Sequence, residues 1–233
     1  MTLNIDETQH EAWNDRMARL YNPDAFITKS GFLIRVVEAS RIRVTNKMLD
    51  IGPHDHVLDL GCGPGNLLEK LNGERVVGVD LSDSLLELAR ERTKNLPHVR
   101  VVKGNAEKLD FPDNTFDRVV CSEVLEHTRN PDVVLNEMAR VTKPGGRVVI
   151  TVPNETLINL TKRTVLLFRL KKFIAGGYDM SDNMLEEWHL NEITGEWVTK
   201  NAEKSFRLEK KRGVPLFPFA YHWIYSFVKK IQS

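Results

Sequence analysis

Residues 57–66 read VLDLGCGPGN, an apolar run followed at once by glycines at alternate positions. The apolar run predicts a buried strand. Gly61, Gly63 and Gly65 predict a sharp turn, in which the backbone can approach a ligand more closely than any Cβ atom would allow. Doubly wound sheets bind nucleotide-like ligands at such turns, beyond the carboxyl ends of their strands. The stretch therefore favours a bound ligand, against the alternative of a glycine-rich turn without one.

The same stretch disfavours a dinucleotide. A dinucleotide fingerprint needs glycine one position later, where this chain has Asn66. Asp80 ends the next apolar run, RVVGVD, and a carboxylate at this place accepts hydrogen bonds from ribose hydroxyls in doubly wound folds. The alternative is that Asp80 caps the following helix. Because the turn and the carboxylate occur together and in order, a nucleoside-like ligand explains both better.

Short β-branched runs alternate with helical ones along the middle of the chain. HVLDL, RVVGVD, VRVVKG, FDRVVCS and RVVITV predict strands, and NLLEKL, SLLELARER and VVLNEMARV predict the helices between them. Ser82 should cap one helix, and Asn130 with Pro131 should open another, which Pro144 to Gly146 close. The alternation predicts an α/β fold with a Rossmann-like, doubly wound, mainly parallel sheet.

Length and composition predict one domain in a reducing compartment. The 233 residues are enough for one sizeable core, and 33 Lys plus Arg against 32 Asp plus Glu give no overall charge that would recruit nucleic acid or an anionic membrane. Cys62 and Cys121 lack CxxC spacing, and the polar N-terminus carries no secretory signal, so we expect a cytoplasmic protein. No apolar segment is long enough to span a bilayer, although peripheral contact is compatible with the sequence.

We expect a single domain over 1–233 in three parts. Residues 1–50 form a helical lead-in with a break at Pro23, and residues 51–153 form the ligand-binding core. Residues 154–233 should hold an amphipathic helix, a joint at Gly176-Gly177, a short helix over 195–202 and a strand at SFRLEKKRGV. The aromatic segment near the C-terminus is expected to be helical and interrupted by its prolines.

These motifs give the chain a family resemblance. VLDLGCGPG, GVDLS, GNAEKLDFPDNTFDRVVCSEVLEH and KPGG resemble the class I S-adenosylmethionine-dependent methyltransferases, in the type 11 group that includes the ubiquinone and menaquinone pathway enzymes. The resemblance covers about residues 50 to 153 and implies S-adenosylmethionine as cofactor. The family fold ends with an antiparallel seventh strand beside the sixth. The sequence shows no such strand, which predicts that it is missing or that the C-terminal topology is altered.

The resemblance also implies a cofactor site. Asp59 and the loop from Gly61 to Gly65 would hold the methionine part, Asp80 the ribose, and Leu81 the adenine. Asn105 stands where the family has Asp, and it keeps an oxygen that can accept from the adenine amino group. The full expected cofactor set is Asp59, Gly61, Cys62, Gly63, Gly65, Asp80, Leu81, Asn105, Ala106, Glu107, Ser122 and Glu123.

The stretch CSEVLEHT, residues 121–128, raises the question of a metal. If a helix began after Cys121, Glu123, Glu126 and His127 would share one face of a turn. The stretch resembles the ExxEH motif of metal-dependent ubiquinone-pathway O-methyltransferases and small-RNA 2′-O-methyltransferases, with His189 as a later fourth ligand. Such a site would hold a divalent ion that lowers the pKa of a substrate hydroxyl. In most relatives the same segment only walls the cofactor and substrate pockets, and that alternative stays open.

The expected reaction is methyl transfer to a small or lipid-like molecule, most of all to a hydroxyl oxygen. His127 or His189 is the candidate base, with or without a metal. Trp13, Met17 and Tyr21, the insert over 154–184 and the aromatic tail are expected to choose the substrate, or else to be plain core. The alternatives are an RNA 2′-O-methyltransferase and an inactive cofactor-binding partner subunit.

Two basic clusters have two interpretations as well. They comprise Lys162, Arg163, Arg169, Lys171 and Lys172, and then Lys204, Arg207, Lys210, Lys211 and Arg212. Both can be solvated faces. The first can instead lie against a membrane surface or clamp an anionic substrate, while Phe217, Phe219, Trp223 and Phe227 contact something hydrophobic.

Overall fold

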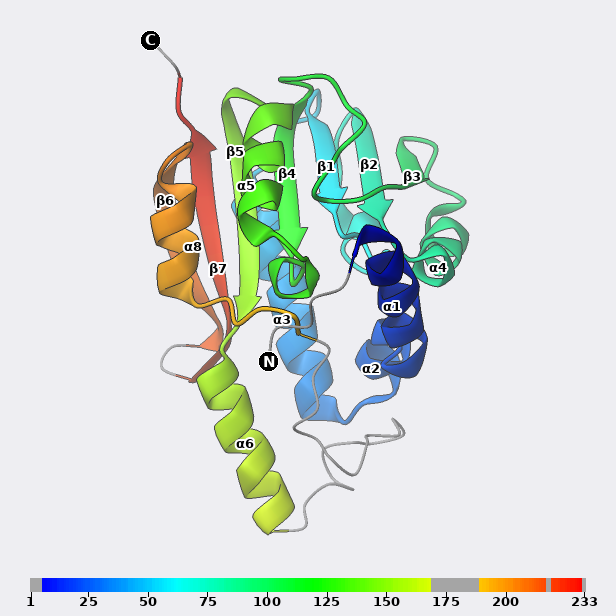
Figure 1. Ribbon diagram of the computed structural model, residues 1–233, viewed down its shortest axis with the longest axis vertical. Helices are drawn as coiled ribbons and strands as arrows, with labels where there is room; N and C mark the ends of the chain where they lie inside the picture. The colour runs from blue at the N-terminus through cyan, green and yellow to red at the C-terminus, as the bar shows by residue number, and fades with distance from the viewer. Residues whose placement is uncertain (1–5, 169–188, 217–218, 232–233) are drawn as a thin grey trace.

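The computed structural model describes residues 6–168, 189–216 and 219–231. They form a seven-stranded sheet in the order β3-β2-β1-β4-β5-β7-β6, with helices packed on both faces (Figure 1). Neighbouring strands among the first five are parallel, while β7 is antiparallel to both β5 and β6. The strands are β1 (His56–Leu60), β2 (Arg75–Asp80), β3 (Val99–Lys103), β4 (Phe116–Ser122), β5 (Thr142–Pro153), β6 (Phe206–Leu216) and β7 (Phe219–Lys229). The predicted doubly wound, mainly parallel α/β sheet is confirmed.

The strand order places the ligand end of the sheet. β1 lies between β2 and β4, so the order of the strands reverses at β1. Connections that leave β1 and β4 therefore diverge to opposite faces and open a crevice beyond the carboxyl ends of the strands. Asp59, Asp80 and Ser122 lie at or near these ends.

Local sequence explains where most helices begin. Asp6 caps the first helix in a capping box with Gln9, and the side chains of Asn22, Ser82 and Thr194 accept backbone hydrogen bonds at three further helix starts. Asn130 precedes Pro131 at the first position of another helix, as expected. The helices are α1 (Glu7–Leu20), α2 (Pro23–Lys29), α3 (Phe32–Leu49), α4 (Asp83–Thr93), α5 (Pro131–Val141), α6 (Glu155–Leu167) and α8 (Gly195–Ala202), with 3-10 turns η1 (Leu68–Lys70) and η2 (Leu125–His127).

The core lies on both faces of the sheet. On one face α5 and α8 pack Leu135, Met138 and Val198 against strand residues such as Leu58 and Phe116. On the other face the end of α3, η1 and α4 pack their apolar side chains around Val57 and Val120. Both faces are buried, which is why the central strands are continuous apolar runs and not alternating ones.

The lead-in differs from the expected pair of helices. The chain breaks at Pro23, as expected, and again at Ser30 and Gly31, so three helices precede the sheet. Gly31 is the N-cap of α3 without a side-chain cap. The second break was missed because the apolar pattern continues across it.

Two boundaries in the core also differ. NLLEKL forms only the single turn η1, because the preceding glycine loop uses left-handed backbone at Gly61, Gly63 and Gly65 and leaves few residues for a helix. Pro144 to Gly146 do not close α5, which ends at Val141. They belong to the start of β5.

The predicted helical tail is wrong, and so is the predicted loss or alteration of the last strand. The aromatic segment forms β7, whose register with β5 runs from Arg147↔Val228 to Pro153↔His222. Tyr225 and Phe227 join one core cluster, and Ile224 joins the other. Both faces of β7 are thus buried, which hid its period of two. Aromatic and β-branched residues favour a pleated strand in such a position.

Several expectations lie outside the described residues: the Gly176-Gly177 joint, most of the 154–184 insert, the basic residues Arg169, Lys171 and Lys172, and Phe217. Within the described part, the short helix at 195–202 and the strand at SFRLEKKRGV are confirmed. A search of the same residues for a helix of the length and apolarity needed to cross a membrane finds none.

Candidate functional site

The glycine loop after β1 has the backbone that its sequence predicts. Gly61, Gly63 and Gly65 all have φ between 51° and 83°, in the left-handed region that favours glycine. A Cβ atom on Gly61 would lie 2.2 Å from Cγ2 of Val124, and one on Gly65 would lie 3.1 Å from Cα of Ala89 in α4. The loop therefore packs tightly between the end of β4 and α4, and no larger residue fits at Gly61.

A cavity of about 250 Å³ lies beyond the ends of β1, β2 and β4, next to this loop. Ten of the twelve expected cofactor residues line it: Asp59, Gly61, Cys62, Gly63, Asp80, Leu81, Asn105, Ala106, Ser122 and Glu123. The two others have structural roles. Gly65 packs on α4, and Glu107 accepts the backbone N–H groups of Arg129 and Asn130 before α5.

Asp80 is fixed by the backbone around it. Its carboxylate accepts the N–H of Gly63 at 2.8 Å and the N–H of Ser82 at 2.9 Å. Burial raises the pKa of Asp80, while these two hydrogen bonds oppose the rise because they favour the charged form. The carboxylate thus ties the glycine loop to the end of β2 and faces the cavity.

Asp59 is a buried carboxylate in need of a partner. Its side chain is 1% exposed, and Oδ2 has no hydrogen-bond partner among the described residues. Burial, together with the negative charge of Asp80, raises the pKa of Asp59 to about 7. An isolated buried carboxylate is costly, so this position suits a ligand that brings a positive charge or a donor into the cavity.

The first three helices cover the cavity, which the sequence did not predict. His10 and Asn14 of α1, Pro23 and Ile27 of α2, and Arg41 and Ile42 of α3 line it opposite the glycine loop. His10 also anchors α1 directly, since its Nε2 lies 2.9 Å from the carbonyl oxygen of His127. Trp13, Met17 and Tyr21, the expected substrate residues of this region, do not line the cavity.

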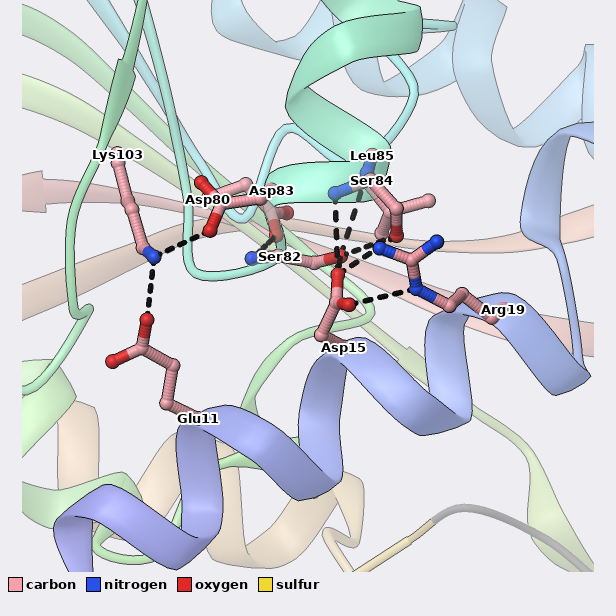
Figure 2. A network of polar contacts seen from close by, with 9 residues as sticks. All are labelled: Glu11, Asp15, Arg19, Asp80, Ser82, Asp83, Ser84, Leu85 and Lys103. Atoms are coloured by element: carbon pink, nitrogen blue, oxygen red, sulfur yellow. Dashed lines mark hydrogen bonds and ion pairs between the residues drawn. The ribbon is translucent and has the colours of Figure 1, made fainter.

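A polar network holds α1 on the cofactor side of the core (Figure 2). Oδ1 of Asp15 accepts the hydroxyls of Ser82 and Ser84 and the backbone N–H of Ser84, all at the start of α4. Glu11 pairs with Lys103 at the end of β3 at 2.5 Å. Ser82 therefore links α1 to Asp80, because its backbone N–H donates to the carboxylate of Asp80 and its hydroxyl donates to that of Asp15.

Glu123 does not join the expected metal set. No helix starts after Cys121: β4 continues to Ser122, Glu123 has φ 57°, and only the 3-10 turn η2 follows. Glu123 instead accepts the hydroxyl of Thr151 at 2.7 Å and lies 3.0 Å from Nδ1 of His222. The ExxEH spacing was interpreted on a helix that does not form.

His222 completes a buried charge network. Its Nε2 lies 3.3 Å from Glu38, which also binds the guanidinium of Arg41, and Arg41 donates to the Ser122 hydroxyl at 2.6 Å. Burial alone would lower the pKa of His222. The charge of Glu123 and the hydrogen bonds to both carboxylates instead raise this pKa to about 9. The charges of Arg41 and His222 lower the pKa of Glu38 and Glu123 against the effect of burial. Two cations and two anions balance beside the cavity.

Glu126, His127 and His189 do come together. One ligand atom from each lies within 4.8 Å of the others, and the rings of His127 and His189 are 5.0 Å apart. Burial and the charge of Glu123 raise the pKa of Glu126, whose Oε2 has no hydrogen-bond partner among the described residues. The pKa of His189 is also raised: Glu155 at 2.8 Å and the charge of Glu126 raise it, against the effect of burial. Only His127 of the three lines the cavity.

Comparison with known proteins assigns the central part of this arrangement. The family described as "Methyltransferase domain" matches residues 58–150, which include the glycine loop, Asp80 and CSEVLEHT.

Residues 58–150 therefore resemble a methyltransferase domain.

Relatives and solved structures agree with this assignment. The domain is similar to the ubiquinone/menaquinone biosynthesis C-methyltransferase UbiE of Escherichia coli, with 36% identity over 136 residues, covering 48% of this chain and 54% of that protein. It is also similar to a demethylmenaquinone methyltransferase of Symbiobacterium thermophilum, with 38% identity over 105 residues and 42% of each chain. This chain therefore matches only about half, or less, of the length of these relatives.

The fold is that of solved methyltransferases. The N-methyltransferase NodS of Bradyrhizobium japonicum, solved with S-adenosyl-l-homocysteine, superposes with a TM-score of 0.65 at 16% identity, over 94% of this chain and 98% of that one. An S-adenosylmethionine-dependent methyltransferase of Thermotoga maritima gives a TM-score of 0.65 at 18% identity, over 95% of this chain and all of that one. The expected class I methyltransferase fold is confirmed.

Of the aromatic residues expected to contact something hydrophobic, Phe227 is buried in the core and Trp223 is partly buried. Phe227 is 1% exposed and packs on Phe206, and Trp223 lies under the ammonium of Lys211 at 4.3 Å. The second basic cluster lies on or beside β6, the edge strand of the sheet, where most of its side chains are exposed. This position is typical of charges that keep an edge strand from pairing with other chains.

Proposed function

We propose that this chain is an S-adenosylmethionine-dependent methyltransferase that binds its cofactor in the cavity beyond β1, β2 and β4. The observation that carries the proposal is the carboxylate oxygen of Asp59 in the cavity, which has no hydrogen-bond partner among the described residues. Asp59 lies beside a glycine loop in which a side chain at position 61 would clash with Val124. The residues fit the cofactor. Asp59 offers an anion to its ammonium group, and Asp80 keeps lone pairs for ribose hydroxyls.

The remaining cofactor roles follow from the cavity wall. Leu81 and Ala106 offer apolar surface to the adenine. Oδ1 of Asn105 accepts the backbone N–H of Glu107 at 2.9 Å, and an amide oxygen can accept a second hydrogen bond from the adenine amino group. When bound, S-adenosylmethionine supplies an electrophilic methyl group on its sulfonium.

We propose a small or lipid-like acceptor with a ring hydroxyl, of the quinol type, and methylation at that oxygen or at a neighbouring ring carbon. The names of the relatives, which act in ubiquinone and menaquinone biosynthesis, support this class. Cavity walls of Ile27, Ile42 and Val124 suit an apolar ring. Residues 51–153 would serve the cofactor, and the flanking segments 1–50 and 154–233 would serve the acceptor.

His127 is the proposed base for the hydroxyl proton. It lines the cavity, whereas His189 lies behind it and pairs with Glu155. Positioning of the two reactants supplies much of the acceleration in such a displacement, so the base needs only to accept one proton at its imidazole. Glu126, His127 and His189 could instead hold a divalent ion, which would polarise the same hydroxyl. We propose a cytoplasmic location, because Cys62 and Cys121 are both free and buried.

The test is transfer of labelled methyl from S-adenosylmethionine into an extract of the source cell, separated into lipid, small-molecule, RNA and protein pools. We expect label in the lipid pool and loss of label with Asp59→Asn. Loss after chelation, restored by added divalent metal, would assign a metal to the Glu126 cluster; unchanged label would assign the proton to His127 alone. Label in RNA would favour the RNA 2′-O-methyltransferase. No label in any pool, from a protein that binds the cofactor, would favour an inactive partner subunit.

A further inference from the structure

The turn between α2 and α3 exposes apolar side chains that the fold does not use. Phe32 is 75% exposed, Leu33 69% and Val36 43%, although all three are large and apolar. Positions 32, 33 and 36 lie within one third of a helical turn of each other around the axis, so they form a single face at the start of α3. The buried residues of α3 begin only at Glu38. Soluble surfaces rarely gather such side chains without a binding role.

The charge of the same segment has one sign. From Ala25 to Val37 the chain reads AFITKSGFLIRVV, with two cations and no carboxylate. Lys29 and Arg35 are both exposed, and neither forms an ion pair within the described part of the chain. The nearest acidic residues in sequence are already bound, since Asp24 pairs with Arg92 at 2.5 Å and Glu38 with Arg41 at 2.6 Å. Among the residues that the structure describes, the neighbours of this apolar face in sequence thus leave only positive charge unpaired.

The segment is continuous with the cavity. Pro23 and Ile27 of α2 line the cavity, and Lys29 and Phe32 follow within five residues on the outer side. Figure 1 shows the start of α3 next to α2, beyond the ends of the strands where the cavity lies. A molecule that docks at this turn is thus separated from the cavity by the short helix α2 alone, one side of which lines the cavity.

We infer that the α2–α3 turn, residues 25–37, docks on a lipid bilayer with anionic headgroups. Phe32, Leu33 and Val36 enter the boundary between headgroups and acyl chains, and Lys29 and Arg35 contact the phosphates. The charge complementarity selects this occupant over a neutral apolar partner. Docking itself does not require methyl transfer, but its use, to deliver a lipid-like acceptor to the cavity, rests on the proposed function.

The test is cosedimentation of the full chain with vesicles that contain no acceptor. The vesicles are pure phosphatidylcholine, or equal parts of phosphatidylcholine and phosphatidylglycerol. We expect binding to the anionic vesicles, a loss of roughly tenfold or more in Phe32→Ser/Leu33→Ser, and a loss of roughly fivefold for each charge removed in Lys29→Gln and Arg35→Gln. Leu208→Ser, at an exposed leucine on β6, and Lys204→Gln are the matched controls and should bind like the wild type.

Two further measurements separate the outcomes. Urea unfolding of the turn variants should match that of the wild type, which shows that they fold and keeps this test independent of the proposed function. Equal vesicle binding by wild type and Phe32→Ser/Leu33→Ser, or no binding by the wild type, would overturn the proposal. A wild-type dimer that becomes a monomer in the same variant, measured by sedimentation velocity without vesicles, would assign the face to a second copy of the chain and overturn it as well.

Discussion

Replacing His222 by glutamine should remove a pH-dependent part of the stability of the fold. His222 is buried between Glu38 and Glu123, and it pairs with both of them. Its pKa is raised from 6.5 to about 9 by these carboxylates, so the folded state holds a proton that the unfolded chain releases near neutral pH. Glutamine keeps a hydrogen-bond donor at this place and cannot titrate.

The magnitude follows from the two pKa values. At about 1.4 kcal/mol for each pH unit, the difference between 6.5 and about 9 corresponds to about 3 kcal/mol. Because the folded pKa is the higher one, this contribution is complete below about pH 6.5 and is lost as the pH rises through about 9. The wild type should therefore lose about 3 kcal/mol more than His222→Gln between these limits.

The assay is urea unfolding of both proteins at a series of pH values from about 6 to about 9.5, with the difference in unfolding free energy plotted against pH. Groups that do not contact His222 titrate equally in both proteins and cancel in this difference, so what remains comes from the network of His222, Glu38 and Glu123. At low pH the variant should be the less stable by several kcal/mol, because it leaves two buried carboxylates with one cation. A difference that stays constant across the range would refute the charge network as described.

Further changes have expected outcomes of their own. Asp15→Asn should lower the unfolding free energy by about 1–2 kcal/mol, since a neutral acceptor replaces the carboxylate at the start of α4. Arg19→Gln breaks only an exposed ion pair and should leave the unfolding free energy nearly unchanged. Equal effects of the two variants in urea unfolding would contradict the network in Figure 2. Gly61→Ala should cost about 2–4 kcal/mol, from left-handed backbone and the contact with Val124, and a thermal melt within error of the wild type would be incompatible with this loop. The affinity for S-adenosylhomocysteine should rise as the pH rises through about 7, because binding below that pH releases about one proton from Asp59. Calorimetry in buffers of different ionisation enthalpy measures this proton. If neither the wild type nor Asp59→Asn releases it, Asp59 does not contact the ligand.

Local patterns predicted the cofactor end of the chain and failed at its flanks. VLDLGCGPGN and Asp80 are contiguous motifs whose geometry depends on neighbours in sequence, so their place at the strand ends could be predicted. The buried network could not, because Glu38, Glu123 and His222 come from α3, the end of β4 and β7, which meet only in the folded sheet. His222 was also concealed by the expected helical tail. The cavity wall formed by His10 and Arg41 had no local signal at all.

The metal prediction shows how one backbone angle decides a site. ExxEH places three ligands on one face only in an α-helix, and the left-handed φ of 57° at Glu123 turns its side chain toward Thr151 and His222. The later histidine, His189, does reach Glu126 and His127, although it is more than sixty residues away in the sequence. Two of the three residues predicted from the ExxEH spacing therefore lie close to His189, and Glu123 does not; whether a metal binds there stays a prediction.

The central claim is that Asp59 receives the positive end of the cofactor in the cavity, and calorimetric binding of S-adenosylhomocysteine to wild type and Asp59→Asn tests it most directly. Without ligand, Asp59→Asn should be the more stable protein above about pH 7, by up to roughly 4 kcal/mol, because it removes a buried carboxylate without a partner. It should nevertheless bind the ligand roughly tenfold or more weakly than the wild type. Equal affinities, or a folded wild type that does not bind the ligand, would contradict the account.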